Sequence, residues 1–402
     1  FTQRDYKMMQ TFTPSEYLKI DIASQFGHDK MTWDDRIQWF DDNKDRLQDL
    51  MPMADNPALF YAGMLAWQAY EKGEPSGYPI SLDATSSGLQ ILSVLTGDKL
   101  AAKICNVVDS GNREDAYTAV YEEMVRSINE VGKISRDMTK QAIMTSLYGS
   151  EAEPKKVFGT GALLNVFYQT MERMTPGVWE LNQAMLHMWN PQAYSNDWIL
   201  PDNFHVHVKV ISTIKENVSF LNEPFEVSRK INAPKESGRS LGANMVHSID
   251  GMIVREMTKR CNHDRARVNT LRWLIMAGVI KEHIENSHTK MVRLLWNHYT
   301  KTGFLSARIL DHLQPYNISL VDVEPVLELI DSLPEKPFQI ISIHDCFRCL
   351  PNYANDMRKQ YTLQLELIAK SDLLSSIVSQ IIGRDVQIGK LDPNLHKEIA
   401  QS

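Results

Sequence analysis

Apolar positions recur at helical spacing over most of this chain, and capping residues mark several helix starts. Thr32 precedes two acidic residues and an amphipathic run, a pattern typical of an N-capped helix whose first turn complements the helix dipole. Asn112 and Ser135 are further candidate N-caps. The other predicted helices cover residues 57–70, 89–95, 112–129, 136–147 and several segments of 262–337.

Two short apolar runs predict strands, and each of them leads to an aspartate. One run follows a turn rich in Gly and Pro and ends at Asp83. The other covers Phe338–His344, leads to Asp345 and is followed by a second run, Phe347–Leu350. Together these runs predict a hairpin with Asp345 at or beside its turn.

Length and composition indicate a globular protein. The 402 residues, 43% of them hydrophobic, suffice for a large core, so one elaborate domain or two subdomains are expected. No apolar run approaches the roughly 18 residues of a membrane-spanning helix, and the first residues have no signal-peptide pattern. Four cysteines in so long a chain suit a reducing compartment. We therefore expect a cytoplasmic protein.

The net charge of −7 is unusual for a protein that handles nucleic acid alone. Neutralisation of phosphates by Lys and Arg normally dominates the affinity for nucleic acid. If the substrate is a nucleic acid, part of the basic surface is therefore expected to belong to another chain.

Two aspartates and one helix carry the candidate chemistry. Asp83 and Asp345 each follow a strand-like run, and carboxylates are ligands that Mg²⁺ prefers. Arg136 and Lys140 stand one turn apart on the predicted helix that ends near Tyr148, so two cations and an aromatic ring share one face. Phosphoryl transfer needs divalent metals and cations placed around a charged leaving group. The combination predicts a nucleotidyl-transfer site.

Taken singly, these signals are weak. An aspartate after an apolar run has a catalytic role in roughly one case in ten. An Arg/Lys pair is more often a solvated helix face, and Tyr148-Gly149 at a helix end is more often a C-cap. The order of the signals and their flanking residues change these odds.

With those flanking residues, the sequence resembles the single-subunit DNA-dependent RNA polymerases of bacteriophages and mitochondria. Segments that resemble the three family motifs are Asp83 to Gln90, Arg136 to Ser150 and His344 to Phe347. Two further segments resemble the approach to the first motif and the block before the third, Tyr17 to Lys30 and Gly242 to Gly251.

The resemblance implies a role for each matching residue. Asp83 and Asp345, with the backbone carbonyl of Ala84, are expected to hold two Mg²⁺ ions. Arg136 and Lys140 are expected to bind the triphosphate, and Lys140 also to donate a proton to departing pyrophosphate.

For the base and sugar, the resemblance implies that Tyr148, followed by Gly149, stacks at the nascent base pair and helps to select ribose. His247 is expected to contact the new pair from its minor-groove side, although a buried, hydrogen-bonded histidine has the same sequence pattern. Lys30 is expected to add a phosphate contact. His344 is expected either to orient Asp345 or to touch the primer end.

One position separates the two nearest functions. Related DNA polymerases carry a Glu five residues after the first metal-binding Asp, where it crowds a 2′-hydroxyl, and this chain has Gly88 there. Gly88 favours ribonucleotides. A DNA polymerase and a catalytically inactive, polymerase-like nucleic-acid-binding subunit remain the alternatives.

Other candidate motifs have a simpler structural interpretation. Cys346 and Cys349 have the spacing of zinc ligands, but no second pair completes a tetrahedral site, so strand packing is expected. His205 and His207 alternate with valines in a predicted half-buried strand, where a surface pair is more common than a metal site. Gly159-Thr-Gly161 lacks the remaining spacing and the lysine of a phosphate-binding loop.

By the resemblance, the chain has a mixed, helix-rich α/β fold, a right-hand polymerase with a palm sheet and helical fingers. The expected segments are an N-terminal helical segment (1–78), the palm with the first motif (79–110), the fingers (111–200), a palm and fingers return (201–261), a helical insertion (262–337) and the palm with the third motif and C-terminal helices (338–402). The insertion matches no family motif. Trp273 and Trp296, which look exposed, suggest docking of a partner, contact with DNA or a self-contained subdomain.

Family members have a long region before the segment that matches Thr13 to Lys30, and this N-terminal promoter and RNA-handling domain is expected to be missing here. Either the chain is a fragment, or a second subunit supplies those functions. The latter resembles the two-subunit middle-gene RNA polymerase of certain short-tailed bacteriophages, with this chain as the larger, catalytic subunit of a heterodimer in a bacterial host. The expected ligands are DNA template, RNA product, nucleoside triphosphates and Mg²⁺.

Overall fold

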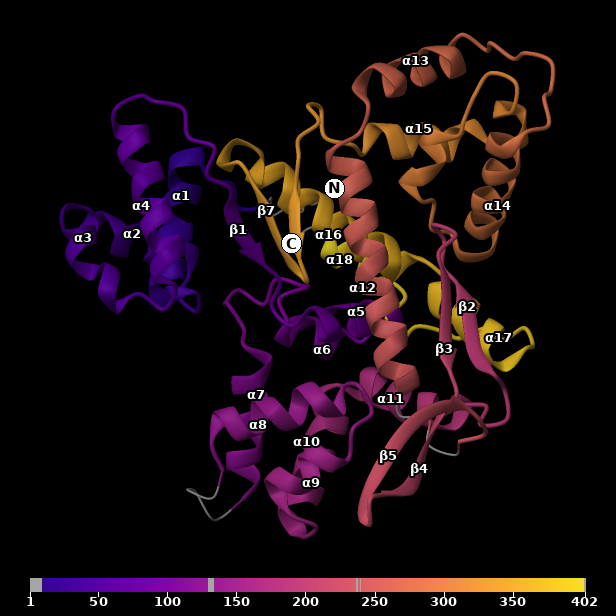
Figure 1. Ribbon diagram of the computed structural model, residues 1–402. Helices are drawn as coiled ribbons and strands as arrows, with labels where there is room; N and C mark the ends of the chain where they lie inside the picture. The colour runs from indigo at the N-terminus through magenta and orange to yellow at the C-terminus, as the bar shows by residue number, and fades with distance from the viewer. Residues whose placement is uncertain (1–8, 129–133, 236–237, 239, 401–402) are drawn as a thin grey trace, which may run out of the picture.

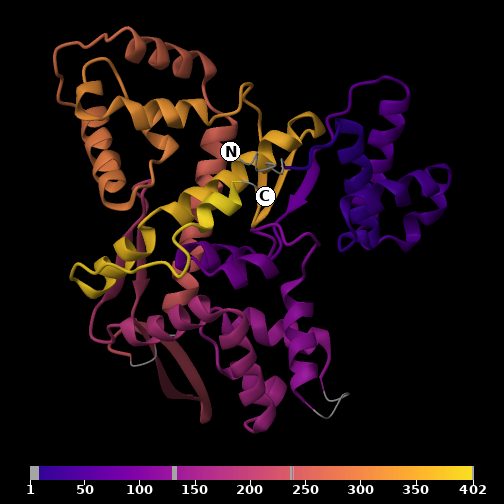
Figure 2. The ribbon, with the colours of Figure 1, turned by 180° about the vertical axis from the view of Figure 1, so that it is seen from behind.

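A small antiparallel sheet lies among the helices that form most of the protein. The structure, a computed structural model, describes residues 9–128, 134–235, 238 and 240–400 (Figure 1). Seen from both sides, the N-terminal helices, the central helices and the helices of 262–337 lie on three different sides of this sheet (Figure 2). The predicted helix-rich α/β class is confirmed.

The helices fall into four groups along the chain. The N-terminal group consists of α1 (Pro14–Ala23), α2 (Trp33–Asn43), α3 (Leu47–Leu50) and α4 (Pro57–Glu71). The central group consists of α5 (Ser87–Thr96), α6 (Lys99–Ile104), α7 (Ala116–Ser127), α8 (Arg136–Ser146), α9 (Ala152–Phe158), α10 (Ala162–Met174) and α11 (Pro176–Met188). The third group consists of α12 (Ser240–Cys261), α13 (Arg265–Met276), α14 (Ser287–Thr302) and α15 (Val323–Asp331). The last group consists of α16 (Ala354–Lys370), α17 (Leu373–Ile382) and α18 (Leu395–Ile399).

The helix caps confirm most of the predicted starts. The side chains of Thr32 and Ser135 accept hydrogen bonds from backbone N–H groups in the first turns of α2 and α8. The predicted start at Asn112 is wrong, because Asp115 caps α7 by accepting from the N–H groups of Tyr117 and Thr118. The predicted end at residue 129 lies outside the described residues. None of the described helices is both long and apolar enough to cross a membrane.

The central sheet brings together the two aspartate-bearing runs. Its strands are β1 (Ile80–Asp83), β6 (Ile341–Ile343) and β7 (Cys346–Cys349), in the order β1-β7-β6, and both pairs are antiparallel. The predicted hairpin is confirmed as β6 and β7, and Asp345 lies in its turn, directly after His344 with its positive φ of 55°. The predicted start of β6 at Phe338 is wrong, since the Phe338 N–H donates to the Cys261 carbonyl oxygen at 2.7 Å instead.

Two more antiparallel pairs follow α11 and precede α12 in the chain. They are β2 (Ser195–Ile199) with β3 (His205–Lys209), and β4 (Ile211–Phe220) with β5 (Glu223–Asn232). The predicted strand with two histidines is confirmed as β3, on which both rings are exposed and His207 contacts the Asp197 carboxylate at 2.7 Å.

The side chains of Cys346 and Cys349 point in opposite directions, which does not suit two ligands of one metal ion. Cys346 and Cys349 are three residues apart in β7, so their side chains point to opposite faces of the sheet. All four cysteines are free. Side chains on opposite faces of one strand do not suit two ligands of one zinc ion.

Residues 268–333 have a hydrophobic core of their own. Val292 and Leu295 are fully buried in it, and it contains no residue from outside that range. Of the two tryptophans expected to be exposed, Trp273 is 63% exposed, whereas Trp296 packs against this core. On α12, the buried Glu256 accepts a hydrogen bond from the Ala307 N–H at 2.9 Å and ties this region to the main core.

A buried carboxylate fixes the first strand of the central sheet. Asp21 on α1 accepts a hydrogen bond from the Ser81 N–H at 2.9 Å and one from the Tyr78 hydroxyl at 2.6 Å. Burial raises the pKa of Asp21, and these two hydrogen bonds oppose that shift. The position of Asp83 along β1 therefore depends on a contact with the N-terminal helices.

Replacement of Asp21 by Ala should destabilise the protein by about 2–4 kcal/mol, because it leaves the Tyr78 hydroxyl and the Ser81 N–H without their acceptor. Chemical denaturation measures the change. Tyr78→Phe, which removes one donor and keeps the other, should cost clearly less. Equal losses in the two variants would contradict this account of the anchor.

Candidate active site

The two predicted metal-binding aspartates lie at the same end of the central sheet. Asp83 is the last residue of β1 and stands directly opposite Cys346, while Asp345 immediately precedes Cys346. Partial burial raises the pKa of Asp83, and the Asp345 carboxylate raises it further. Asp83 is nevertheless exposed to solvent. Its carboxylate is therefore partly desolvated by the neighbouring residues of the sheet end and is not enclosed in a cavity.

The turn after Asp83 is supported by side chains of neighbouring segments. Ser86 has a positive φ of 62°, an unusual backbone conformation for a residue other than glycine. The Tyr117 hydroxyl donates to the Ser86 hydroxyl at 3.3 Å, and the Asn106 amide donates to the Thr85 hydroxyl at 3.3 Å. These contacts hold the segment that carries Ala84 beside Asp83.

Tyr148, His247 and Gly88 meet at one point, although they come from three different helices or helix ends. The rings of Tyr148 and His247 are stacked, with centroids 5.3 Å apart and planes at 22°. A Cβ added at the buried Gly88 would overlap the Tyr148 hydroxyl and lie 3.1 Å from its Cζ. His247 is exposed, so the alternative of a buried, hydrogen-bonded histidine is wrong.

Gly149 directly follows Tyr148 in the turn after α8. Its φ of 81° is in the left-handed region, and its N–H donates to the Ser146 carbonyl oxygen at 3.0 Å. Glycine at this place lets the chain leave the helix without a steric penalty. The residue therefore positions the Tyr148 end of α8.

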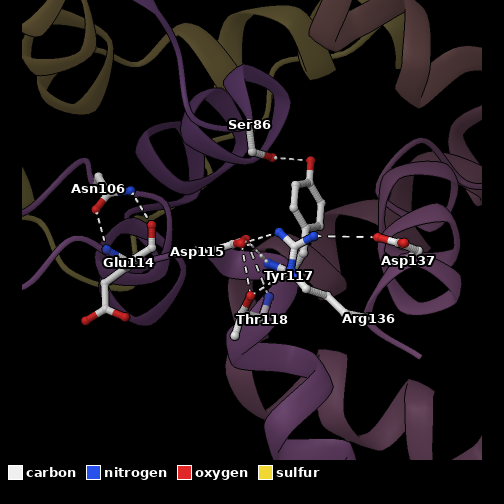
Figure 3. A network of polar contacts seen from close by, with 8 residues as sticks. All are labelled: Ser86, Asn106, Glu114, Asp115, Tyr117, Thr118, Arg136 and Asp137. Atoms are coloured by element: carbon white, nitrogen blue, oxygen red, sulfur yellow. Dashed lines mark hydrogen bonds and ion pairs between the residues drawn. The ribbon is translucent and has the colours of Figure 1, made fainter. Parts of the chain in front are cut away.

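Arg136 is held by α7 in a network of polar contacts (Figure 3). Its Nε donates to the Thr118 hydroxyl at 2.8 Å, and its Nη2 pairs with the Asp115 carboxylate. The guanidinium of Arg136 and the Thr118 hydrogen bonds lower the pKa of Asp115 against the opposing effect of burial. Among the described residues, the one partner of Nη1 is the exposed Asp137, at a long distance of 3.7 Å.

Lys140 is exposed one turn further along α8, with its Nζ 5.5 Å from the centre of the Tyr117 ring. Lys30 is also exposed and lies in the turn that follows Gly27, next to Asp29. The charge of Asp29 contributes to the raised pKa of Asp83, after burial and Asp345, so this turn lies near the sheet end. Arg113 also holds the turn, by donating to the Met31 carbonyl oxygen at 2.6 Å.

Three residues of this region received no role from sequence reasoning. Asp115 and Tyr117 lie in a segment without a recognised motif, and Asp250 lies inside the block that was matched only through His247. Burial raises the pKa of Asp250 and the Asp345 carboxylate raises it further, while His247 and His344 lower it. An acid one turn after His247 was the only available signal for Asp250.

The oxygen donors at the sheet end fit a hard divalent cation. Mg²⁺ is usually held by one or two carboxylates plus substrate phosphates and water. Asp83 and Asp345 would supply the carboxylates, and Ala84 a backbone carbonyl. Among the residues that the structure describes, no group of three or more acidic, His or Cys side chains has metal-binding geometry.

Residues 13–157, which include Asp83, Arg136, Lys140 and Tyr148, match the family of DNA-dependent RNA polymerases. Over this part the chain is thus similar to DNA-directed RNA polymerases of a phage and of mitochondria.

Individual relatives include the DNA-directed RNA polymerase of Pseudomonas phage phiKMV, 29% identical over 33% of this chain and 21% of that protein. A mitochondrial DNA-directed RNA polymerase of Neurospora crassa is 30% identical over 33% of this chain and 11% of its own length. A probable DNA-directed RNA polymerase of a Gelasinospora species is 22% identical over 87% of this chain and 41% of its own length. The chain therefore spans less than half of each of these relatives.

Gly88→Ala should be coupled to Tyr148 in stability, because the new methyl group overlaps the tyrosine hydroxyl. Overpacking of this kind costs about 1–3 kcal/mol. In a Tyr148→Phe background the same change should cost at least about 1 kcal/mol less. Thermal or chemical unfolding of the two single variants and the double variant measures the coupling, and strict additivity would contradict the close contact.

Proposed function

We propose that this chain catalyses DNA-templated RNA synthesis, transferring nucleotidyl groups from nucleoside triphosphates with two Mg²⁺ ions. The observation that carries the proposal is the meeting of Asp83 and Asp345, from opposite ends of the chain, beside the group formed by Tyr148, His247 and Gly88. It joins a candidate metal site to a candidate nucleoside site. The relatives, which are DNA-directed RNA polymerases, support the same reaction class.

Asp83 and Asp345 are the groups that would hold the metal ions, with Ala84 contributing its carbonyl oxygen. Bound Mg²⁺ would activate the attacking 3′-oxygen and neutralise charge on the phosphates. The mutual repulsion of the two carboxylates raises the pKa of Asp83, and a divalent cation between them would relieve it. Lys30, beside the sheet end, is a further candidate phosphate contact.

Arg136 and Lys140 are the cations proposed for the triphosphate. The guanidinium uses Nε and Nη2 toward α7, so the donors on Nη1 are available for phosphate oxygens. Asp115 and Thr118 thereby orient Arg136 without occupying all of its hydrogen-bond donors. Lys140 is exposed on the same face of α8, and we propose that it also donates the proton to departing pyrophosphate.

Sugar selection is proposed to rest on Tyr148 and Gly88. Within the described part of the chain, no hydrogen bond occupies the Tyr148 hydroxyl, which leaves it available to a ribose 2′-hydroxyl. A Glu at position 88, as in related DNA polymerases, would collide with the tyrosine in this arrangement. The contact of Gly88 with Tyr148 thus favours ribonucleotides over the DNA polymerase alternative.

Because the chain spans only part of its relatives, we also propose that further polypeptide completes the working polymerase. It would supply promoter recognition and early RNA handling. It would also supply part of the basic surface for nucleic acid, because this chain has a net charge of −7. A second subunit in the cytoplasm of a phage-infected bacterium is the form of this proposal that we favour. Separation of the native complex, followed by mass spectrometry of stoichiometric partners, tests it.

Replacement of Asp83 or Asp345 by Asn should lower extension of a primed DNA template with nucleoside triphosphates by roughly 10³-fold or more, since each change removes a metal ligand worth several kcal/mol. Asp49→Asn, an exposed change on α3, is the matched control and should leave extension unchanged. Circular dichroism verifies the folding of all three variants. Near-normal extension by either active-site variant would refute the assignment.

Tyr148→Phe should reduce the preference for ribonucleotides, because the hydroxyl that senses the sugar is lost while the ring and its stack on His247 remain. A loss of about tenfold is expected for one hydrogen bond. The ratio of kcat/KM for ATP and dATP on one primed template measures it. An unchanged ratio would exclude this role of the hydroxyl.

A further inference from the structure

Asp250 is an acidic side chain of the candidate site that has no role in the reaction as proposed above. It lies on α12, one turn after His247, so the two side chains share one face of that helix. Its carboxylate is close enough to His247 and His344 for both imidazoles to favour its charged form. Two histidines from different parts of the fold therefore act electrostatically on this acid.

Two hydroxyl groups of this part of the site are engaged elsewhere. The Tyr361 hydroxyl, whose pKa is raised by burial and then by Asp250, donates to the Gln90 side-chain oxygen at 2.8 Å. The Tyr117 hydroxyl donates to Ser86. Among the described residues, the imidazoles of His247 and His344 and the Tyr148 hydroxyl, whose pKa is raised by burial, Tyr117 and then Asp250, remain without a hydrogen bond to another side chain.

His247 needs such a partner if it is to keep one orientation. Its ring is exposed, and its contact with the Tyr148 ring is a stack, which fixes the plane of the imidazole but not which nitrogen faces the substrate. A carboxylate next to a histidine fixes both the tautomer and the ring orientation. Asp250 is the carboxylate on the same helix face.

Resting on the proposed function, we propose that Asp250 is a positioning residue that holds the His247 imidazole against Tyr148 and thereby sharpens the choice of ribonucleotides over deoxyribonucleotides. The proposed path starts at Asp250, which shares a face of α12 with His247, and continues through the stacked His247 and Tyr148 rings to Gly88. His344, at the turn beside Asp345, is the second neighbour of the carboxylate. It belongs to the metal-binding end of the site and is expected to act independently of sugar selection.

The test is nucleotide selectivity in Asp250→Asn, which keeps the size of the side chain and removes its charge. The ratio of kcat/KM for ATP and dATP on a primed template should fall about tenfold, the value of one hydrogen bond to a charged group. Asp49→Asn is the matched control and should keep the wild-type ratio. Asp250→Glu, which restores the carboxylate, should recover most of the lost selectivity, whereas a merely structural role would gain nothing from it.

Double variants show which histidine transmits the effect. In a His247→Ala background, Asp250→Asn should cause no further loss of selectivity, and in a His344→Ala background it should cause the full loss. The same loss in the His247→Ala background, or wild-type selectivity in Asp250→Asn, would overturn the inference. If Asp250→Asn folds poorly in thermal unfolding, the comparison of Asp250→Glu alone and with His247→Ala decides in the same way.

Failure of the underlying proposal gives a different result. A wild-type protein, supplied with its native partners, that incorporates no ribonucleotide would refute the proposed function itself. A wild-type protein that prefers ATP, together with Asp250 variants that keep this preference, would refute only the role of Asp250.

Discussion

The antiparallel pairing of β1 with β7 is the contact on which the candidate site depends. It joins a strand near residue 80 to one near residue 348, and its register sets Asp83 opposite Cys346. Because Asp345 comes just before Cys346, both carboxylates must lie at the same end of the ladder. The Arg348 side chain reinforces this register by donating to the Ser81 hydroxyl at 2.7 Å, and Asp21 fixes β1 from the other side. A slip of one residue would turn Asp83 to the opposite face of the sheet.

Features set by neighbouring residues in the chain were predictable from the sequence. The caps at Thr32 and Ser135 and the hairpin turn at Asp345 need only local hydrogen bonds and turn geometry. The site as a whole was approached through family motifs, whose spacing identifies Asp83 and Asp345 without showing how they meet. The resemblance to the polymerase family is confirmed, while the roles of the individual residues remain proposals.

Features set by contacts between distant segments were missed. Asp115 rather than Asn112 caps α7, and its carboxylate is also the partner of Arg136 from the next helix, a fact that no local pattern contains. The apolar run from Phe338 looked like a continuous strand. Its first part instead bonds to the end of α12, because the Phe338 N–H meets the Cys261 carbonyl oxygen there. At Phe338 tertiary packing overrides the local pattern, whereas the cap at Asp115 is itself local and lies three residues after the predicted one.

The charges around the site are arranged for a ligand rather than for the stability of the free protein. The Asp345 carboxylate repels those of Asp83 and Asp250, and this repulsion adds to the pKa shifts that burial causes in these two residues. The two cations proposed for the triphosphate have other partners, because Arg136 pairs with Asp115 and Lys140 faces the Tyr117 ring. Such repulsion lowers stability, and active sites commonly carry this cost. A metal ion held between Asp83 and Asp345 would remove it, so ligand binding should stabilise the fold at the very sheet end where its own charges oppose it.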